Sequence, residues 1–515
     1  MLVAPPSVRR ARDHNRGSRA GDGRKFASLL PMFGCEKISI DSCLNLSIGS
    51  YSAAVVRFDP RLLPHNLHWQ GAASFLERDP TLLRMRSQPF VFRPPLLDAL
   101  PHDTPGIYTL VGGRQVGKST LCKQFLAERL AAGVAPGRLA YVTCEPFVDA
   151  EALQHLLTDL LVELAPAREP CWLLLDEVTY VDGWDRVVKF LADSGQLDSC
   201  FLLATGSDRL LIEDSLKRLP GRRGQAEVVD FHLRPLTFLE FCRLRSRVDV
   251  AELLRCAGEP LDAAVVASPF LDALERELRD YHLTGGFLPA INDLARTGGI
   301  SVATFRTYAD WIRGDVLRLD RSERYLREVL TGIHRRQSSQ VTWNAFAKEL
   351  SIDSPKTVAD YIAILERMDV LQVVPALVEH TGGPAPKKAR KVYFADPFVH
   401  RAVLSWLGED DALESDARLQ RDLEGVFAAH VGRAGDVFYI KGDGEIDVAF
   451  YEQRHLHLVE VKWTAQLRPE ELKEMRRRGR GTIAARVARS VTYEGLPVLP
   501  AAVVLLRLAA RSERA

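Results

Sequence analysis

Nine consecutive residues have the types and spacing of a loop that holds phosphate groups: Gly112, Gly113, Arg114, Gln115, Val116, Gly117, Lys118, Ser119 and Thr120. Its glycines let successive backbone N–H groups turn toward phosphate oxygens. Lys118 can reach β- and γ-phosphates, and the Ser119 hydroxyl can bind Mg²⁺. The alternative is a glycine turn that matches the pattern by chance.

The surroundings of this loop favour the phosphate-binding interpretation. Residues 107–111 form an apolar run that is typical of a strand, and the residues that follow Thr120 have helical periodicity. A loop between a strand and a helix places the positive end of the helix dipole at the phosphates. We therefore expect ATP and Mg²⁺ to bind at residues 112–120.

Two carboxylates end a second apolar run. Residues 171–175 are apolar on both faces, as in the middle of a parallel sheet covered by helices, and Asp176 and Glu177 follow them. Open α/β sheets bind ligands at the carboxyl ends of such strands. We expect Asp176 to complete the Mg²⁺ shell and Glu177 to orient and deprotonate the attacking water. Taken alone, such a run would often be only a strand that leaves the core.

Two further segments offer groups to the γ-phosphate. Thr205 and Ser207 follow a third apolar run, and either would serve as a sensor if that strand lies beside the Asp176 strand. A simple exit from strand to turn is the alternative. Arg222 and Arg223 lie in a glycine-flanked turn, where an arginine would stabilise the transferred phosphoryl group in cis or from a neighbouring subunit. A solvated surface turn is the competing interpretation.

A second constellation lies near the end of the chain. Asp447 belongs to one expected strand, and Glu460 and Lys462 share a face of the next strand because side chains alternate. Two adjacent hairpin strands can converge these side chains. Asp447 and Glu460 would then hold Mg²⁺, and Lys462 would steady the attacking water or the phosphate. Glu424, on the preceding helix, is the candidate for an extra carboxylate.

Between these two sites the pattern predicts two short helices, at residues 343–350 and 355–368, followed by two strands. This is the order of a winged helix-turn-helix, and a basic wing would bind the phosphates of a nucleic acid. A module used for packing or protein docking explains the pattern equally well, because the second helix offers few side chains for base reading: Lys356, Thr357 and Asp360. The expected wing carries four basic residues: Lys387, Lys388, Arg390 and Lys391.

The composition limits the classes of function and the location that the chain can have. In 515 residues, Lys plus Arg (68) nearly equals Asp plus Glu (67), so the net charge gives no sign of nucleic acid. Eight cysteines without C-x-x-C spacing fit the reduced thiols of a cytoplasmic protein. Residues 496–506 form an apolar stretch too short to cross a bilayer, so we expect a last strand and no membrane partner. Residues 1–55 are basic and lack the apolar core of a secretory signal.

Several motifs together resemble the AAA+-related ATPases of the archaeal-ATPase group, over about residues 90–510. That group has a large C-terminal domain of unknown function after its ATPase core. The resemblance implies ATP binding and hydrolysis, and it leaves a homo-oligomer open. Asp447, Glu460 and Lys462 are similar to the PD-(D/E)xK core of restriction-endonuclease-like folds. The motifs of the ATPase resemblance are the phosphate loop, Leu173-Leu174-Leu175-Asp176-Glu177, Ala204-Thr205-Gly206-Ser207, Pro220-Gly221-Arg222 and Tyr393-Phe394-Ala395-Asp396-Pro397.

We therefore expect an α/β protein with a P-loop parallel-sheet ATPase core, a helical connector with a winged helix-turn-helix, and a restriction-endonuclease-like α/β domain. One functional hypothesis is an ATPase that gates a metal-dependent nuclease. The other is a nucleotide-dependent switch that controls DNA or protein docking, with a catalytically silent C-terminal core. The expected segments are a disordered or misassigned extension (1–55), the ATPase (56–235), the connector (236–335), the winged helix (336–400) and the nuclease-like domain (401–515).

Overall fold

The structure is a computed structural model that describes residues 59–166, 169–217, 221–249, 252–253, 255, 270–409 and 416–514. The chain divides after Val56, and everything below concerns the unit that begins at Arg57. The expectation for residues 1–55 lies outside the described residues.

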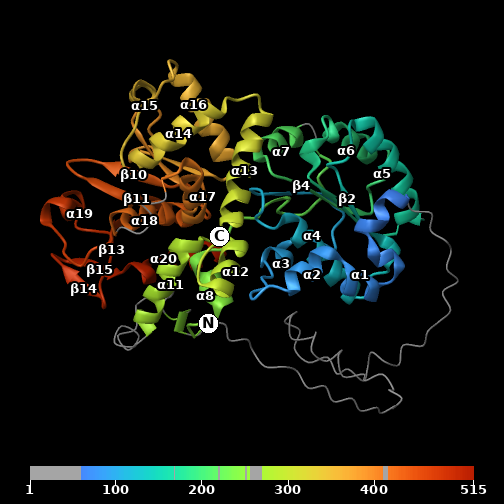
Figure 1. Ribbon diagram of the computed structural model, residues 1–515, viewed down its shortest axis with the longest axis horizontal. Coiled ribbons are helices and arrows are strands. Elements are labelled where there is room, and N and C mark those ends of the chain that lie inside the picture. Colours follow the sequence, from blue (N-terminus) through green and yellow to red (C-terminus); the bar gives the residue numbers. More distant parts are fainter. Residues whose placement is uncertain are drawn as a thin grey trace, which may run out of the picture. The chain divides into compact units, whose positions relative to one another are not determined.

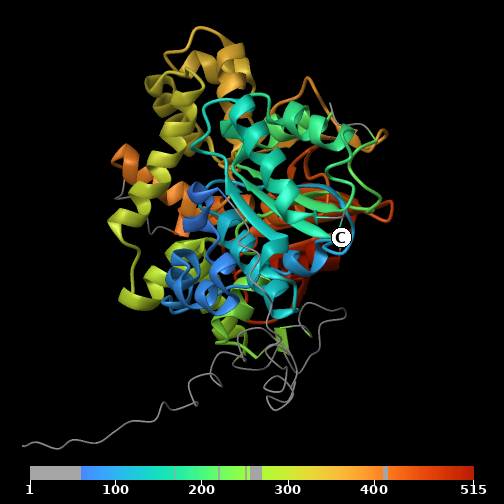
Figure 2. The ribbon, with the colours of Figure 1, turned by 90° about the vertical axis from the view of Figure 1, so that its right-hand side faces the viewer.

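A five-stranded, all-parallel sheet forms the first part of this unit, with the strand order β2-β3-β4-β1-β5 (Figures 1 and 2). Because β4 lies between β1 and β3, the ends of these three strands meet at one edge. The phosphate loop follows β1, and Asp176 ends β3, so both come to that edge. The strands are β1 (Gly106–Val111), β2 (Leu139–Thr143), β3 (Cys171–Asp176), β4 (Cys200–Gly206) and β5 (Asp230–His232).

Helices cover this sheet on both faces. Leucines three and four residues apart, such as Leu153, Leu157, Leu160 and Leu164, give one helix a continuous apolar stripe that is buried against the sheet. One face of the sheet packs against α5 (Ala150–Leu164) and α6 (Trp184–Asp193). The other packs against α4 (Lys118–Ala131) with α1 (Ala72–Arg78), α2 (Pro80–Arg86) and α3 (Leu96–Ala99); α7 (Arg209–Leu216) follows β4.

The middle of the chain is helical and ends in a small antiparallel pair of strands. Pro355 occupies the first turn of α16, where a missing N–H costs nothing, and Ser354 stands at its N-cap without a side-chain capping bond. Strands β6 (Leu371–Pro375) and β9 (Arg390–Phe394) pair antiparallel, with Val374 opposite Lys391. The helices are α8 (Phe238–Arg245), α11 (Phe270–Thr284), α12 (Leu288–Thr297), α13 (Val302–Arg318), α14 (Glu323–Arg336), α15 (Trp343–Glu349), α16 (Pro355–Arg367) and α17 (Pro397–Leu407).

A mixed six-stranded sheet forms the last part, in the order β10-β11-β12-β13-β15-β14 (Figure 1). Strand β10 also meets the middle segment through a bridge between Tyr439 and Ala376. The strands are β10 (Phe438–Lys441), β11 (Glu445–Glu452), β12 (His455–Lys462), β13 (Thr482–Ala485), β14 (Val491–Tyr493) and β15 (Leu496–Pro500); the short pair in the middle segment is β7 (Leu377–Val378) and β8 (Gly383–Pro384). The helices are α18 (Asp416–Val431), α19 (Lys473–Arg478) and α20 (Ala501–Arg514).

The side-chain cores cross the expected domain boundaries. One core joins α12–α14 to α15, α16, the β6–β9 pair and α17, across the boundary expected at residue 335. Another joins α8 and α11 to α18, α20 and the last sheet. The helices that were expected to form a separate connector thus belong to two different cores, each shared with neighbouring segments.

The apolar stretch near the end is a strand only in part. Strand β15 ends at Pro500, and α20 begins at Ala501. This helix is buried within a core, so it is apolar on most of its surface, and a short apolar run of that kind does not distinguish strand from helix. In the described part of the chain, no helix combines the length and the apolarity needed to cross a membrane.

Candidate functional site

The phosphate loop joins the end of β1 to the start of α4, and its backbone requires glycine at two places. A Cβ on Gly112 would lie 2.3 Å from the Leu233 carbonyl oxygen, so this position has no room for a side chain. Gly117 has φ +110°, which favours glycine. The loop therefore reaches the N-terminus of α4 in the conformation that its sequence predicts.

Lys118 is buried, and its ammonium group bonds to the loop itself. Nζ donates to the Gly112 carbonyl oxygen at 2.9 Å and lies 3.2 Å from Glu177 Oε1. The lysine is thus folded back over the loop, beside the carboxylate at the end of the neighbouring strand. An anion that offers better acceptors than a carbonyl would draw the ammonium to itself.

Asp176 is the centre of the hydrogen-bond network at this edge of the sheet. Its Oδ2 accepts from Ser119 Oγ at 2.6 Å and from the Tyr141 hydroxyl at 2.5 Å, and its Oδ1 accepts from Thr205 Oγ1 at 2.5 Å. Burial, together with the Asp176 charge, raises the pKa of Tyr141, so its hydroxyl stays protonated. Three strands and the first turn of α4 therefore hold this carboxylate in one position.

Glu177 is held in an uncommon backbone conformation beside this network. Its φ is +56°, and its N–H donates to Thr205 Oγ1 at 3.1 Å. One carboxylate oxygen faces Lys118, while Oε2 is buried and has no hydrogen-bond partner among the described residues. An unpartnered buried carboxylate oxygen next to a phosphate loop has the chemistry of a base for a water molecule.

These groups line one cavity of about 480 Å³, a size that suits a nucleotide. Its wall includes loop residues 114–120, Asp176, Glu177 and Arg234, and Leu288 and Pro289 of α12 close another side. The Ser119 hydroxyl and the Asp176 carboxylate, 2.6 Å apart, are the hard oxygen donors that Mg²⁺ requires beside phosphates. The residues present therefore fit a nucleotide with Mg²⁺.

The first half of the loop is bound to the middle of the chain. The Gly113 N–H donates to Asp369 Oδ2 at 3.2 Å, and the same oxygen lies 2.8 Å from His232 Nε2. The Arg114 guanidinium pairs with Asp315 of α13 at 2.7 Å and bonds to the Tyr180 hydroxyl. Arg114 therefore lines the cavity, but its charge is directed to α13.

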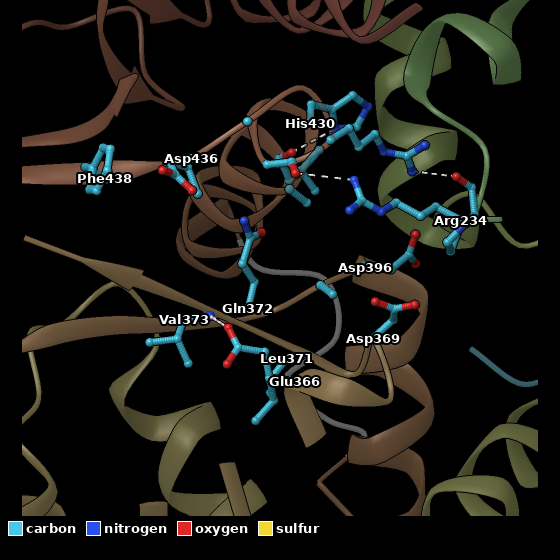
Figure 3. A pocket seen from close by; sticks show the side chains of 18 of the residues that line it. Arg234, Glu366, Asp369, Leu371, Gln372, Val373, Asp396, His430, Asp436 and Phe438 are labelled. Atoms are coloured by element: carbon cyan, nitrogen blue, oxygen red, sulfur yellow. Dashed lines mark hydrogen bonds between the residues drawn. The ribbon is translucent and has the colours of Figure 1, made fainter. Parts of the chain in front are cut away.

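Asp369 also borders a second cavity, of about 670 Å³, between the middle segment and the last sheet. Figure 3 shows Arg234, Asp369 and Asp396 around it, with Glu366 below. Burial, together with the nearby Arg433 charge, lowers the pKa of Arg234 to about 10; its Nη1 donates to the Gly432 carbonyl oxygen at 3.3 Å. Arg234 lines both cavities, so the nucleotide cavity and this one share a wall.

Two of the predicted phosphate contacts do not line the nucleotide cavity. Arg222 forms an ion pair with Asp193, the last residue of α6. A Cβ on nearby Gly224 would lie 2.8 Å from the Pro105 carbonyl oxygen, which places this turn at the start of β1. The loop follows the other end of that strand, so a role for Arg222 in cis was wrong. Ser207 is buried, but it does not line the cavity.

The C-terminal constellation does assemble. Asp447 on β11 and Glu460 and Lys462 on β12 lie at the same end of a hairpin, because Asp447 Oδ2 accepts from the Val461 N–H at 3.0 Å. Lys462 Nζ lies 2.8 Å from Glu460 Oε1. Glu424 on α18 accepts from the Tyr393 hydroxyl at 3.1 Å. Burial, together with the Asp447 charge, raises the pKa of Glu424 to about 7.

Lys391 was expected on the surface of a basic wing, and that expectation was wrong. Its side chain is 0% exposed, and Nζ lies 3.0 Å from Asp447 Oδ1 and 3.5 Å from Glu424 Oε2, and it pairs with Glu445. Although burial favours the neutral acid, Lys391 and Lys462 hold the pKa of Asp447 below its usual range. The true surface cations of this loop are Lys387 and Lys388.

The cluster as arranged does not fit a divalent metal. Both Asp447 oxygens already have partners, Lys391 and the Val461 N–H, and only Glu460 Oε2 is buried without one. No group of three His, Cys, Asp or Glu side chains within the described ranges could hold a metal ion. The Lys391 ammonium group lies among the carboxylates, where a metal ion would have to bind.

Sequence reasoning missed Tyr141, Arg234, Asp369 and Lys391 as parts of these sites. Tyr141 lies on β2, the strand that pairs with the Asp176 strand, so its contact follows from the strand order of the sheet. The other three meet their partners across long sequence separations, such as 256 residues between Gly113 and Asp369. No local pattern carries that information.

Comparisons with known proteins agree with the first of these sites. Residues 104–242 match the family model described as an AAA domain, and residues 275–410 match a domain of unknown function, DUF8612. An uncharacterized protein of Haemophilus influenzae is 29% identical over 149 residues, and the uncharacterized protein MJ1637 of Methanocaldococcus jannaschii is 27% identical over 202 residues. These matches cover 28% and 38% of this chain, and they span 35% and 40% of those relatives.

Among solved structures, the Walker-type ATPase of Pyrococcus abyssi is similar, with 17% identity, a TM-score of 0.39, and coverage of 58% of this chain and 90% of that one. The ORC1 protein of Aeropyrum pernix in complex with DNA has 16% identity and a TM-score of 0.30, with coverage of 63% and 92%. Because these TM-scores are low, the class rests on the parallel sheet, the loop and the AAA match. The first part of the chain is a P-loop ATPase-like AAA domain.

Proposed function

We propose that this chain is a Mg²⁺-dependent ATPase that works as a nucleotide-controlled switch. The observation that carries the proposal is the convergence of Lys118, Ser119, Asp176 and Glu177 on one cavity of nucleotide size. Glycine geometry, hard oxygen donors and an unpartnered base are the requirements of phosphoryl transfer to water.

Each residue has a separate task in this proposal. Lys118 leaves the Gly112 carbonyl and binds the β- and γ-phosphate oxygens, while the loop N–H groups hold the same phosphates. Ser119 and Asp176 hold Mg²⁺, which neutralises charge on the phosphates when it is bound. Glu177 takes the proton of the attacking water, and Thr205 keeps Asp176 and Glu177 in register.

The contacts of the loop support the switch. Gly113 and Arg114 are bonded to Asp369 and Asp315, so a loop that closes on phosphates pulls on the turn before β6 and on α13. Helices α14–α16 and the β6–β9 pair follow the element order of a winged helix. We propose that this module docks DNA or protein, with Lys387 and Lys388 as its exposed cations.

A nuclease is the second candidate, and the convergence of Asp447, Glu460 and Lys462 is the observation that favours it. Lys391 opposes it in the arrangement described. The arginines of α19, between β12 and β13, add little, since Arg476, Arg477 and Arg478 are engaged by Glu494, Glu474 and Glu379. We therefore propose the switch with a silent C-terminal core ahead of the nuclease.

Lys118→Ala tests the nucleotide site. Removing the ammonium takes away the main cationic contact of the phosphates, so ATP affinity should fall at least about 100-fold, the equivalent of roughly 3 kcal/mol for a charged hydrogen-bonded group. Isothermal titration with Mg²⁺ and ATP measures this. Lys189→Ala, which removes an exposed lysine of α6, is the control and should bind normally. Equal affinity in the wild type and Lys118→Ala would rule out this loop as the ATP site.

A further inference from the structure

Lys391 is a fully buried cation of the middle segment, and its ammonium group lies against the C-terminal sheet. It stands on β9, while the carboxylates around it belong to α18 (Glu424) and β11 (Glu445 and Asp447). Lysine is rarely buried in full unless it is paired. Here three carboxylates meet the three donors of one ammonium group.

The Lys391 ammonium group lies where carboxylates from neighbouring elements converge. Two or more carboxylates that converge from neighbouring elements make a site for a hard divalent cation. Lys391 Nζ donates to Asp447 Oδ1 and the Val461 N–H donates to Oδ2, so each Asp447 oxygen already accepts a hydrogen bond, and the ammonium charge beside Oδ1 repels a divalent cation. Lys462 is engaged on the other side of the cluster, by Glu460.

The lysine is held in place by the packing of its strand. Lys391 pairs in register with Val374 of β6, and Ala376, just beyond that strand, bridges to Tyr439 of β10. The Tyr439 hydroxyl donates to the Ala389 carbonyl oxygen at 2.7 Å, two residues before Lys391. The ammonium therefore enters the cluster with the whole β6–β9 pair and leaves only if that pair moves.

We propose that Lys391 is the resident cation of the acidic cluster and the residue that closes it to divalent metal ions. The cluster then has the carboxylates of a metal site, but the docked β6–β9 pair keeps the Lys391 ammonium group among them. This inference stands whether or not the phosphate loop hydrolyses ATP. Lys391 then decides whether the cluster is a docking core or a metal-binding site.

Mn²⁺ binding to the full chain tests the inference, measured from the loss of the electron paramagnetic resonance signal of free Mn²⁺. Lys391→Met keeps the length of the side chain and removes its charge, and it should gain one Mn²⁺ ion per chain relative to the wild type. Lys391→Met with Asp447→Asn should lose that ion again. Any Mn²⁺ at the phosphate loop is common to all of these proteins, and Lys391→Arg should behave like the wild type.

Two results would overturn the inference. One is Mn²⁺ binding by the wild type that Asp447→Asn abolishes, and the other is a folded Lys391→Met variant that gains no ion. If Lys391→Met does not fold, wild-type crystals soaked in Mn²⁺ decide the matter through anomalous scattering. No anomalous peak is expected among Glu424, Glu445, Asp447 and Glu460, and a peak there would contradict the role of Lys391.

Discussion

Thr205 links the two carboxylates on which the proposed reaction depends. It is fully buried on β4, between the strands of the phosphate loop and of Asp176. Its hydroxyl donates to Asp176 and accepts from the Glu177 N–H. One side chain therefore bonds both to Asp176, the proposed Mg²⁺ ligand, and to the backbone of Glu177, the proposed base.

Thr205→Val tests this link with a side chain of the same shape. The substitution leaves a charged oxygen and a backbone N–H without their partner, a loss of about 1.5–3 kcal/mol for a hydrogen bond to a charged group. We expect kcat for ATP hydrolysis to fall about 10- to 100-fold, with ATP affinity changed much less. Thr205→Ser retains the hydroxyl and should stay close to the wild type. A normal kcat in Thr205→Val would show that the hydroxyl does not position these acids.

At the residue scale, the sequence predicted which strand ends lie together, but it assigned Thr205 to the γ-phosphate, whereas the Thr205 hydroxyl bonds to Asp176. The loop, Asp176 and Thr205 follow apolar runs that end at one edge of a parallel sheet, so their convergence follows from topology. The expectation that Arg222 contacts the phosphates in cis was wrong because a turn between two strands can lie at either edge of the sheet. Its ion pair with Asp193 is visible only in three dimensions.

The turn between α16 and β6 is the element that connects the two candidate sites. Asp369 has φ +58° in this turn and accepts from Gly113 and His232, and Lys391 lies opposite the fourth residue of the strand that begins at Leu371. A displacement of the turn would thus be passed along β6 to β9. The turn that precedes this strand pair contacts the phosphate loop, and Lys391 of β9 enters the acidic cluster.

Asp369→Asn tests whether the turn restrains the loop. Asparagine tolerates the same backbone conformation, but it removes a negative charge that competes with phosphates for the loop. We expect ATP affinity to rise about 3- to 10-fold, within the range of one charged hydrogen bond. Asp320→Asn is the matched control, since Asp320 also has positive φ (53°) but is exposed at the end of α13.

Titration with a non-hydrolysable ATP analogue measures the effect of Asp369→Asn. The same affinity in all three proteins, or weaker binding by Asp369→Asn, would mean that the turn does not hold back the loop.

Structure at this scale was partly predictable from periodicity. The helices at residues 343–349 and 355–367 and the strand pair after them follow from apolar spacing. That Lys391 faces inward, to acids more than 30 residues away, does not.

At the scale of the whole molecule, the packing joins segments that the sequence divided. The predicted boundaries at residues 335 and 400 followed changes in pattern, but two cores extend across them. His430 of α18 illustrates this, since its Nε2 accepts from the Phe238 N–H at the start of α8, 192 residues away. The helices that follow the first sheet are therefore packed in common cores with the last sheet and with the β6–β9 pair.

ATP hydrolysis by the wild type and Glu177→Gln, measured together with nucleotide binding, tests the central claim most directly. Glutamine keeps the size of the side chain but cannot accept the proton of the attacking water. Both proteins should bind ATP with Mg²⁺ equally well, and kcat should fall about 100-fold or more in Glu177→Gln. Equal turnover by the two proteins, or a wild type that binds no ATP, would contradict an ATPase built on this loop and this base.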